Sequence, residues 1–252
     1  MSPKNPDRHI FALYYDRTSF LRDAVGKSIA IEDKALHHRI VHVLRFLVGS
    51  HCILFDKTYR ADIVVEKINK KTFEVLIVSL QANTLLYPHI ALLLPVLKRQ
   101  ALAEAVYAAV EAGVSDIQLV ATQKVQRSWG GQKELERLQA VVIAASEQAK
   151  HFTIPDIKAP IILESALSSL EKDALRVFYD AAGSSFTEIS LQDSKKAITV
   201  LVGPEGDLSA QEKQMVADNN FISIHLTPTI LRSPQAVTLG IGILRTVYND
   251  SV

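Results

Sequence analysis

The feature that most constrains the fold is a change in hydrophobic period near residue 87. Upstream of it, residues 61–68 and 73–80 alternate between apolar and polar side chains, which predicts antiparallel strands. Downstream, residues 90–96 form a continuous apolar run, which is typical of a strand buried on both faces of a sheet. The sequence therefore predicts a small, barrel-like β domain followed by an α/β domain.

Each part of the chain contains further patterns. In the first part we expect a strand at residues 9–15 and a helix at residues 33–47, where apolar residues recur at helical spacing. In the second part helix and strand patterns alternate, which favours a mostly parallel sheet with helices on both faces. We place the two domains at residues 1–75 and 76–252. The expected helices of the second domain are 98–112, 132–150 and 234–248, and its further strands are 116–121, 175–179, 197–202 and 221–226.

The composition is that of a globular protein. Hydrophobic residues make up 48% and charged residues 22% of the 252 positions, which excludes the disordered, collagen-like and coiled-coil classes. The single cysteine, Cys52, permits neither an internal disulfide nor a zinc site of paired thiolates, and it suits a reducing compartment. No apolar stretch reaches the roughly 18 residues of a membrane span, and residues 1–9 lead into no signal peptide. We therefore expect a cytoplasmic protein.

Charge is distributed unevenly along the chain. Residues 1–80 carry 13 Lys and Arg against 9 Asp and Glu, a net charge of +4, and residues 81–252 carry 15 against 18, a net charge of −3. Such asymmetry suggests a basic module that meets a polyanion, with ordinary variation of surface charge as the alternative. His38 and His42 share a helical face beside His37, but no carboxylate or cysteine at ligand spacing accompanies them, so we expect no metal site.

Two loops have the character of ligand-binding loops. In the first, a buried strand ends in Gly203-Pro204-Glu205-Gly206, and Ser209 and Glu212 have the spacing of a capping box for the next helix. Glycines allow a ligand to approach the backbone closely, and loops at the carboxyl ends of parallel strands bind ligands in α/β sheets. An ordinary strand-to-helix turn is the alternative. The defining residues of dinucleotide and P-loop sites are missing.

The second loop repeats this architecture about 23 residues later. A strand ends at Leu226, a loop holds Pro228 and Arg232, and a helix begins at Ser233 or Pro234, because proline suits the first helical position. Loops that follow neighbouring parallel strands lie side by side at one sheet edge. Their apolar residues suit a flat organic ligand better than a phosphate.

These motifs resemble those of a known family. Gly203-Pro-Glu-Gly206, with Ser209 and Glu212, and Ile230-Leu-Arg232 closely resemble the RsmE family of 16S ribosomal RNA uridine N3-methyltransferases, within the SPOUT superfamily. The resemblance spans nearly the whole chain in family order. Its further members are His38, Val43-Leu-Arg45, Phe55-Asp56, Lys98, Glu111-x-Gly-Val114, Ala145-Ser-Glu-Gln148 and Ile154-Pro155.

The resemblance implies a fold, a cofactor and partners. It implies a PUA-like RNA-binding domain at residues 1–75 and a SPOUT methyltransferase domain with a C-terminal trefoil knot at residues 76–252. S-adenosyl-L-methionine is the implied cofactor, a homodimer the implied assembly, and 16S ribosomal RNA in the small ribosomal subunit the implied substrate. The expected cofactor-binding residues are Ala181, Leu201, Gly203, Pro204, Glu205, Gly206, Leu226, Ile230, Leu231, Arg232, Ser233 and Ala236.

Several side chains are candidates for substrate contact. Arg232 is the catalytic candidate, since its fork of donors can hold the base or a phosphate, although it could instead be a surface arginine at a helix start. Glu205 could accept a proton, but we favour a structural role in which it caps a backbone amide. The candidates for contact with the RNA backbone, each of which could instead be a solvated surface residue, are His38, Arg39, Arg45, Arg60 and Lys98.

The chain departs from the family pattern at several positions. These departures affect substrate contacts more than cofactor binding through backbone groups, because Arg and Lys side chains supply phosphate contacts. Methylation of another RNA position and a non-catalytic ribosome assembly factor remain alternatives. A nucleotide-phosphate enzyme that uses residues 203–206 as an anion loop is a third alternative, and the absent lysine and acidic metal ligands count against it. The departures are Asp207, Leu208, Thr227, Thr229, Ser233, Pro234, Gln235, Ala108, His151 and the turn at 57–60.

Overall fold

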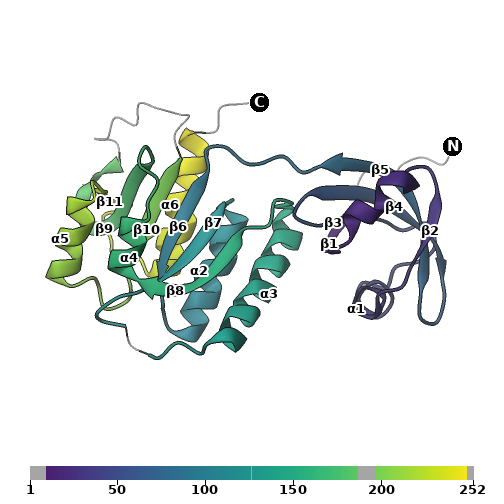
Figure 1. Cartoon of the computed structure of the whole chain (residues 1–252), viewed down its shortest axis with the longest axis horizontal. Helices are drawn as coiled ribbons and strands as arrows, with labels where there is room; N and C mark the ends of the chain where they lie inside the picture. The colour runs from purple at the N-terminus through teal and green to yellow at the C-terminus, as the bar shows by residue number, and fades with distance from the viewer. Residues whose placement is uncertain (1–9, 126, 187–196, 249–252) are drawn as a thin grey trace. The chain divides into compact units, whose positions relative to one another are not determined.

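The computed structural model describes residues 10–125, 127–186 and 197–248, and the chain divides into two compact units between Thr84 and Leu85 (Figure 1). The expected boundary at residue 75 falls inside strand β5 (Phe73–Ala82), which pairs with a neighbouring strand on each side. Because a paired strand cannot be divided between two units, the division comes only after β5 has ended.

The N-terminal unit contains one mixed five-stranded sheet. Its strand order is β1-β3-β4-β5-β2, with β1 parallel to β3 and the other neighbours antiparallel. The antiparallel strands expected at 61–68 and 73–80 are confirmed within longer strands. Besides β5, the elements are β1 (Phe11–Tyr14), the 3₁₀ helix η1 (Thr18–Ala24), β2 (Ser28–Ile31), α1 (Lys34–His38), the π-helical turn η2 (Arg39–Val43), β3 (His51–Phe55) and β4 (Tyr59–Ile68).

Apolar side chains from one face of this sheet form the core of the unit. Leu54, Ile63 and Val75 are buried there, as the alternation along the strands predicts. Cys52 belongs to the same core, and burial raises the pKa of its thiol to about 12. A thiol in such surroundings is unreactive and serves as a small apolar side chain.

The helix expected at residues 33–47 is wrong in its length. It begins as expected, since the Asp33 carboxylate accepts a hydrogen bond from the Leu36 N–H at 2.8 Å. The α-helix ends at His38 and widens into η2, and Arg45 then takes a left-handed φ of 53°. Because the helix stops early, Val43 and Leu47, which the helical spacing assigns to the buried face, are 61% and 69% exposed.

The C-terminal unit is built on a six-stranded sheet of order β11-β9-β10-β6-β7-β8, and every neighbouring pair in it is parallel. The expected parallel sheet is therefore confirmed. Its strands are β6 (Ile90–Pro95), β7 (Asp116–Ala121), β8 (Asp156–Ile162), β9 (Leu175–Ser185), β10 (Ile198–Val202) and β11 (Ile222–His225). Its helices are α2 (Arg99–Glu111), α3 (Gln132–Ala149), α4 (Leu163–Ser168), α5 (Ala210–Asp218) and α6 (Ser233–Val247).

Helices cover both faces of this sheet, as expected (Figure 1). Helices α2, α3 and α6 pack together on one face, and α4 and α5 pack on the other. On the second face, Leu93, Phe178 and Leu201 of the sheet pack against Leu167 and Val216 of these helices. Alternate strand residues point to the opposite face, so every residue of β10 is buried. No helix in the described part of the chain has the length and apolar character needed to cross a membrane.

Candidate functional site

A cavity of about 440 Å³ lies where β9, β10 and β11 end. The carboxyl ends of parallel strands are where α/β sheets bind ligands. Both loops singled out in the sequence reach this cavity, together with the end of β9. The cavity is lined by Tyr179, Asp180, Ala181, Val202, Gly203, Pro204, Glu205, Asp207, Ile224, His225, Leu226, Thr227, Thr229, Ile230, Leu231, Arg232, Ser233 and Ala236.

An irregularity in β9 brings its polar residues to the cavity. Phe178 pairs with Ser223 of β11, but the next residue of β11, Ile224, pairs with Ser184. Residues 179–183 of β9 therefore have no register partner in β11 and form a bulge between these two residue pairs. Three of these residues line the cavity. The sequence pattern predicts a strand that ends at Tyr179, because the polar and small residues after it carry no strand signal.

The loop after β10 makes hydrogen bonds with residues at the starts of two helices, α2 and α6. The Ser233 hydroxyl, at the start of α6, donates a hydrogen bond of 2.7 Å to the Gly203 carbonyl oxygen. The Glu205 carboxylate accepts a 3.3 Å hydrogen bond from the Lys98 backbone N–H, at the start of α2. This contact matches the structural role favoured for Glu205. The loop's backbone is thus held close to the starts of α2 and α6.

The same loop leads into α5 through the expected capping box. The Ser209 hydroxyl accepts from the Glu212 N–H, and the Glu212 carboxylate accepts from the Ser209 N–H at 2.8 Å. Glu212 is only 2% exposed, and its other oxygen accepts a 2.7 Å hydrogen bond from the Gln123 N–H after β7. A buried carboxylate that accepts two backbone hydrogen bonds in this way orders the loop that precedes α5.

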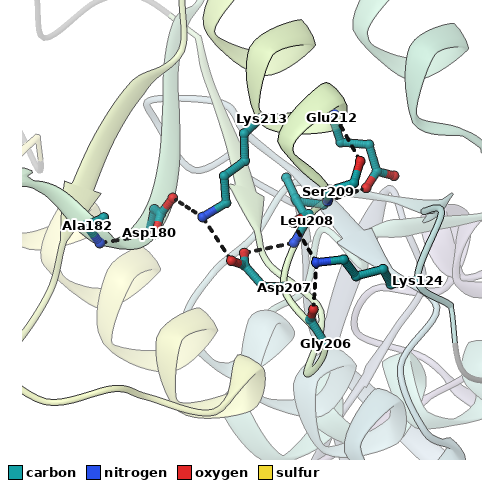
Figure 2. A network of polar contacts seen from close by, with 9 residues as sticks. All are labelled: Lys124, Asp180, Ala182, Gly206, Asp207, Leu208, Ser209, Glu212 and Lys213. Carbon is teal, nitrogen blue, oxygen red and sulfur yellow. Dashed lines mark hydrogen bonds and ion pairs between the residues drawn. The ribbon is translucent and has the colours of Figure 1, made fainter.

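Two lysines also hold this loop (Figure 2). The Lys213 ammonium lies 2.8 Å from an Asp180 oxygen and 2.9 Å from an Asp207 oxygen. The Lys124 ammonium donates to the carbonyl oxygens of Gly206 and Leu208 at 3.3 and 3.1 Å. Burial raises the pKa of Asp180, but the hydrogen bond and charge of Lys213 outweigh it and hold that pKa below its usual value. The Asp180 carboxylate is therefore ionised near neutral pH.

Tyr179 lines the cavity, and its hydroxyl is buried against α6. Its side chain packs against Gly240 of α6, where an added Cβ would lie 2.1 Å from the tyrosine ring, so only glycine fits at position 240. Burial raises the pKa of Tyr179. Its hydroxyl has no hydrogen-bond partner among the described residues. A buried polar atom without a partner is uncommon, and this one lies against α6.

Arg232 lies where the second loop meets α6. It occupies the N-cap position of that helix, lines the cavity and is exposed. Its side chain makes no hydrogen bond or ion pair with the described residues, so its guanidinium can turn toward a molecule that reaches the cavity.

The structure brings most of the expected cofactor-binding residues together. Leu201 and Gly206 do not line the cavity: Leu201 is buried in the core under α4 and α5, and the Gly206 carbonyl faces Lys124. The other ten line it: Ala181, Gly203, Pro204, Glu205, Leu226, Ile230, Leu231, Arg232, Ser233 and Ala236.

The RNA-contact candidates lie elsewhere. His38 and Arg45 are exposed in the N-terminal unit, and Lys98 is exposed at the start of α2. Arg39 and Arg60 are partly buried, and Arg60 donates to Gln81 at 3.0 Å. In the described ranges 10–125, 127–186 and 197–248, no group of three or more His, Cys, Asp and Glu side chains could hold a metal ion.

Sequence reasoning missed several residues of the wall. Asp207, Thr227 and Thr229 stood out only as departures from a family pattern, although all three line the cavity. Tyr179 and Asp180 carried no signal, since their place depends on the irregular pairing of β9 with β11. His225, at the end of β11, makes a 2.8 Å hydrogen bond with the Gly183 carbonyl, and its position just before the loop was the available signal.

The cavity fits S-adenosylmethionine. Apolar side chains, including those of Val202, Leu226 and Leu231, supply surface for a flat purine ring. A side chain at Gly203 would project into open space, so the backbone there is accessible to a ligand. The carboxylates of Asp180 and Asp207 suit a cationic ligand.

Comparison with known proteins agrees with this site. Residues 85–245 match the model of a family described as an RNA methyltransferase domain. The chain is 28% identical over 232 residues to ribosomal RNA small subunit methyltransferase E of Buchnera aphidicola subsp. Schizaphis graminum, covering 86% of this chain and 90% of that protein. It is 27% identical over 236 residues to the protein of the same name from Rickettsia conorii, covering 90% and 93%.

Solved structures share the fold. A ribosomal RNA small subunit methyltransferase E from Neisseria gonorrhoeae, bound to S-adenosyl methionine, superposes with a TM-score of 0.83 at 23% identity, covering 95% of this chain and 98% of that one. A putative methyltransferase from Legionella pneumophila, also with that cofactor bound, gives a TM-score of 0.82 at 21% identity and the same coverage. Both neighbours therefore have the fold that places this cavity.

Proposed function

From the premise that this chain belongs to the RNA methyltransferase family, with RsmE proteins as its relatives, we propose that it methylates uridine N3 in 16S ribosomal RNA with S-adenosyl-L-methionine. The observation that carries the proposal is the cavity itself. It lies within the family domain, and the two motif loops that the family shares meet there with the end of β9. The choice of uridine N3 follows from the RsmE resemblance.

The cofactor supplies an electrophilic methyl group on a sulfonium, and the protein's main task is to align the reacting atoms. We assign cofactor binding to the ten expected residues that line the cavity. The backbone of residues 203–205 and the apolar residues 226–231 enclose the cofactor from two sides. The capping box and the Ser233 contact hold these two loops in place before binding, which lowers the entropy that binding costs.

Arg232 is the residue that we assign to the substrate base. The N3 of uracil carries a proton and lies on the pairing edge, so the base must be unpaired, and its negative charge must be stabilised as the proton leaves. A guanidinium at the cavity wall can donate two hydrogen bonds to a planar acceptor and supply the compensating charge. Burial raises the pKa of Tyr179, which also lines the cavity, so it remains a neutral hydroxyl and is not the base.

We assign RNA docking to the N-terminal unit, as a PUA-like domain. Its support is the exposure of His38 and Arg45 together with the net charge of +4 on residues 1–80. Contacts with phosphates supply most of the sequence-independent affinity for nucleic acid. Lys98, exposed at the start of α2, is the one RNA-contact candidate that lies in the C-terminal unit.

We also propose a homodimer, a trefoil knot and a cytoplasmic location, as the resemblance implies. For the knot, the support is that the chain returns from the edge strand β11 to pack α6 against β10 and α2. For the dimer, it is an open depression of about 480 Å³ between α2 and α6 that includes Tyr107, Ala108 and Pro234. Sedimentation of the purified protein tests the dimer directly.

The test of function uses labelled S-adenosylmethionine and small ribosomal subunits that lack the modification. After incubation with the purified protein, the RNA is digested to nucleosides and analysed by mass spectrometry, and we expect N3-methyluridine. Another methylated nucleoside would indicate a different RNA position. Cofactor binding without transfer to either subunits or free RNA would favour the assembly-factor alternative, and a protein that binds no cofactor would contradict the proposal.

A further inference from the structure

We infer that Lys213 is a positioning residue, which joins two walls of the cofactor cavity through Asp180 and Asp207 although it does not line the cavity itself. This inference rests on the proposed function and adds to it a determinant of cofactor affinity. Asp180 belongs to the irregular segment of β9, and Asp207 belongs to the loop after β10. Both line the cavity, whereas Lys213 projects from α5 behind them (Figure 2).

The geometry makes Lys213 a bridge between the two loops. Its ammonium lies 2.8 Å from one carboxylate and 2.9 Å from the other. The two arms differ in exposure: the side chain of Asp180 is 14% exposed, that of Lys213 32% and that of Asp207 58%. The ion pair with Asp180 is therefore less screened by solvent and fixes the position of the lysine ammonium. The ion pair with Asp207 then holds the loop after β10 to that ammonium.

Asp207 needs such a contact because of its backbone. Its φ is +58°, in the left-handed region that glycine occupies readily and that other residues adopt at a cost. Its other carboxylate oxygen accepts a hydrogen bond from the Leu208 N–H at 2.8 Å, so the side chain holds the turn together from within. Asp207 is also one of the departures from the family pattern named above.

Removing the lysine charge would leave two carboxylates facing one another across the cavity wall. Their repulsion would favour separation of the β9 segment from the loop after β10, which would keep its contacts with Lys124, Lys98 and Ser233. A cofactor that needs both walls would have to bring them together on binding. The cost would appear in cofactor affinity, since the groups that contact the substrate base are unchanged.

The experiment compares the full-length wild type with Lys213→Met and Lys213→Arg. The dissociation constant for S-adenosylmethionine is measured by calorimetry, and KM for the cofactor and kcat are measured with small ribosomal subunits. We expect Lys213→Met to raise Kd and KM about tenfold, the change that ordering one or two extra side chains on binding would produce, with kcat altered less than about threefold. Lys213→Arg keeps the charge and should restore Kd to within about threefold of the wild-type value.

Two further variants keep the result interpretable. Lys133→Met removes an exposed lysine of α3 and should leave Kd and KM unchanged. Asp207→Gly removes one arm of the bridge but suits the left-handed backbone, so it should fold even if Lys213→Met does not. We expect it to raise Kd about threefold, because the Asp180 arm remains.

The outcomes distinguish the positioning role of Lys213 from the proposed function. Equal cofactor affinities of the wild type, Lys213→Met and Asp207→Gly would overturn the positioning role and leave the proposed function intact. A fall in kcat at unchanged KM, or a failure of Lys213→Arg to restore affinity, would also overturn it. A wild-type protein that binds no S-adenosylmethionine would overturn the proposed function and this inference together.

Discussion

The two units differ in how deeply their paired basic side chains are buried: in its ion pair the side chain of Arg127 is 16% exposed, whereas that of Lys67 is 61% exposed. In the C-terminal unit, Lys124, Arg127, Lys213 and Arg245 all donate to carbonyl or carboxylate oxygens of the same unit. In the N-terminal unit, Arg45 is exposed and makes no hydrogen bond or ion pair with the described residues. The comparison teaches that net charge alone does not locate an RNA-binding surface. Cations that are already paired hold the cavity unit together, and cations that face solvent remain available to a polyanion.

The ion pair between Arg127 and Glu134 illustrates the structural use. Its side chains are 16% and 6% exposed, and the Glu134 carboxylate accepts bonds of 2.9 and 2.7 Å from the guanidinium and 2.8 Å from the Gly130 N–H. Burial raises the pKa of Glu134, but these hydrogen bonds outweigh it and hold the pKa below its usual value. The guanidinium also donates to the Leu97 carbonyl at 2.7 Å, so this pair joins the loops after β6 and β7.

Arg232 differs from the paired cations of the C-terminal unit because it is exposed and lines the cavity, and its replacement should have the largest effect. We expect Arg232→Ala to lower kcat/KM for small ribosomal subunits at least about a hundredfold, the cost of losing a donor to developing charge. The thermal midpoint should not change, because the exposed side chain supports no other residue. Arg137→Ala, which removes an exposed arginine of α3, is the control. Full activity of Arg232→Ala would show that this arginine belongs with the merely solvated cations.

The structural use of charge predicts a loss of stability when Arg127 is replaced. Arg127→Met leaves the Glu134 carboxylate buried without its partner, and we expect the free energy of unfolding of the C-terminal unit to fall by about 3 kcal/mol. Lys67→Met in the other unit removes an ion pair with Glu74 whose side chains are 61% and 35% exposed, so its cost should stay below about 1 kcal/mol. Urea denaturation measures both, and similar losses would contradict the comparison.

The N-terminal unit should determine RNA affinity without affecting the cofactor. We expect the double variant His38→Ala, Arg45→Ala to bind small-subunit RNA about tenfold more weakly, with a salt dependence reduced by about one ion. Calorimetry should show the same affinity for S-adenosylmethionine as in the wild type. Lys70→Ala serves as a control that removes one exposed charge of the same unit. If it weakened RNA binding as much, general charge and not a defined surface would explain the affinity.

The pKa of Asp180 predicts the smallest effect. Because its pKa is lower in the folded protein than the ordinary value near 3.9, its ionised form stabilises the fold. Asp180→Asn should therefore cost about 1 kcal/mol at neutral pH, the worth of a charge-assisted hydrogen bond. The difference from the wild type should remain constant above about pH 5 and shrink as pH falls through the folded pKa. Unfolding measured between pH 3 and 7 checks the sign; a difference that grew in acid would contradict it.

Most of the C-terminal sheet could be predicted from the sequence, because strands buried on both faces leave continuous apolar runs such as Ile90–Pro95. Strand β8 was missed since it lies at the sheet edge, contains Pro160 and has mostly exposed or partly exposed residues. Helix α4 was missed because it has only six residues. The helix expected at residues 33–47 shows the opposite error, because its apolar spacing continues past the point where Arg45 turns the backbone.

Part of the candidate site could likewise be predicted from the sequence. The glycine-containing loop at 203–206 and the proline and serine at the start of α6 are local signals, and the structure places both beside one cavity. No local signal distinguishes Asp180, because its position depends on extra residues between two pairs of β9 and β11. Lys213 has a helical pattern like that of any surface lysine, and only its contacts with two separate loops reveal its place.

The sequence by itself determined the two-part organisation, the parallel sheet and the two loops with the character of ligand-binding loops. It did so because hydrophobic period, helix caps and glycine act over a few neighbouring residues. Only the tertiary structure decided which side chains meet at the cavity wall and which cations are already paired. Those facts join residues that are far apart in the chain, as Lys124 is from Leu208, and Asp180 from Lys213. Such contacts depend on how strands pair and helices return to the sheet, which local sequence patterns do not encode.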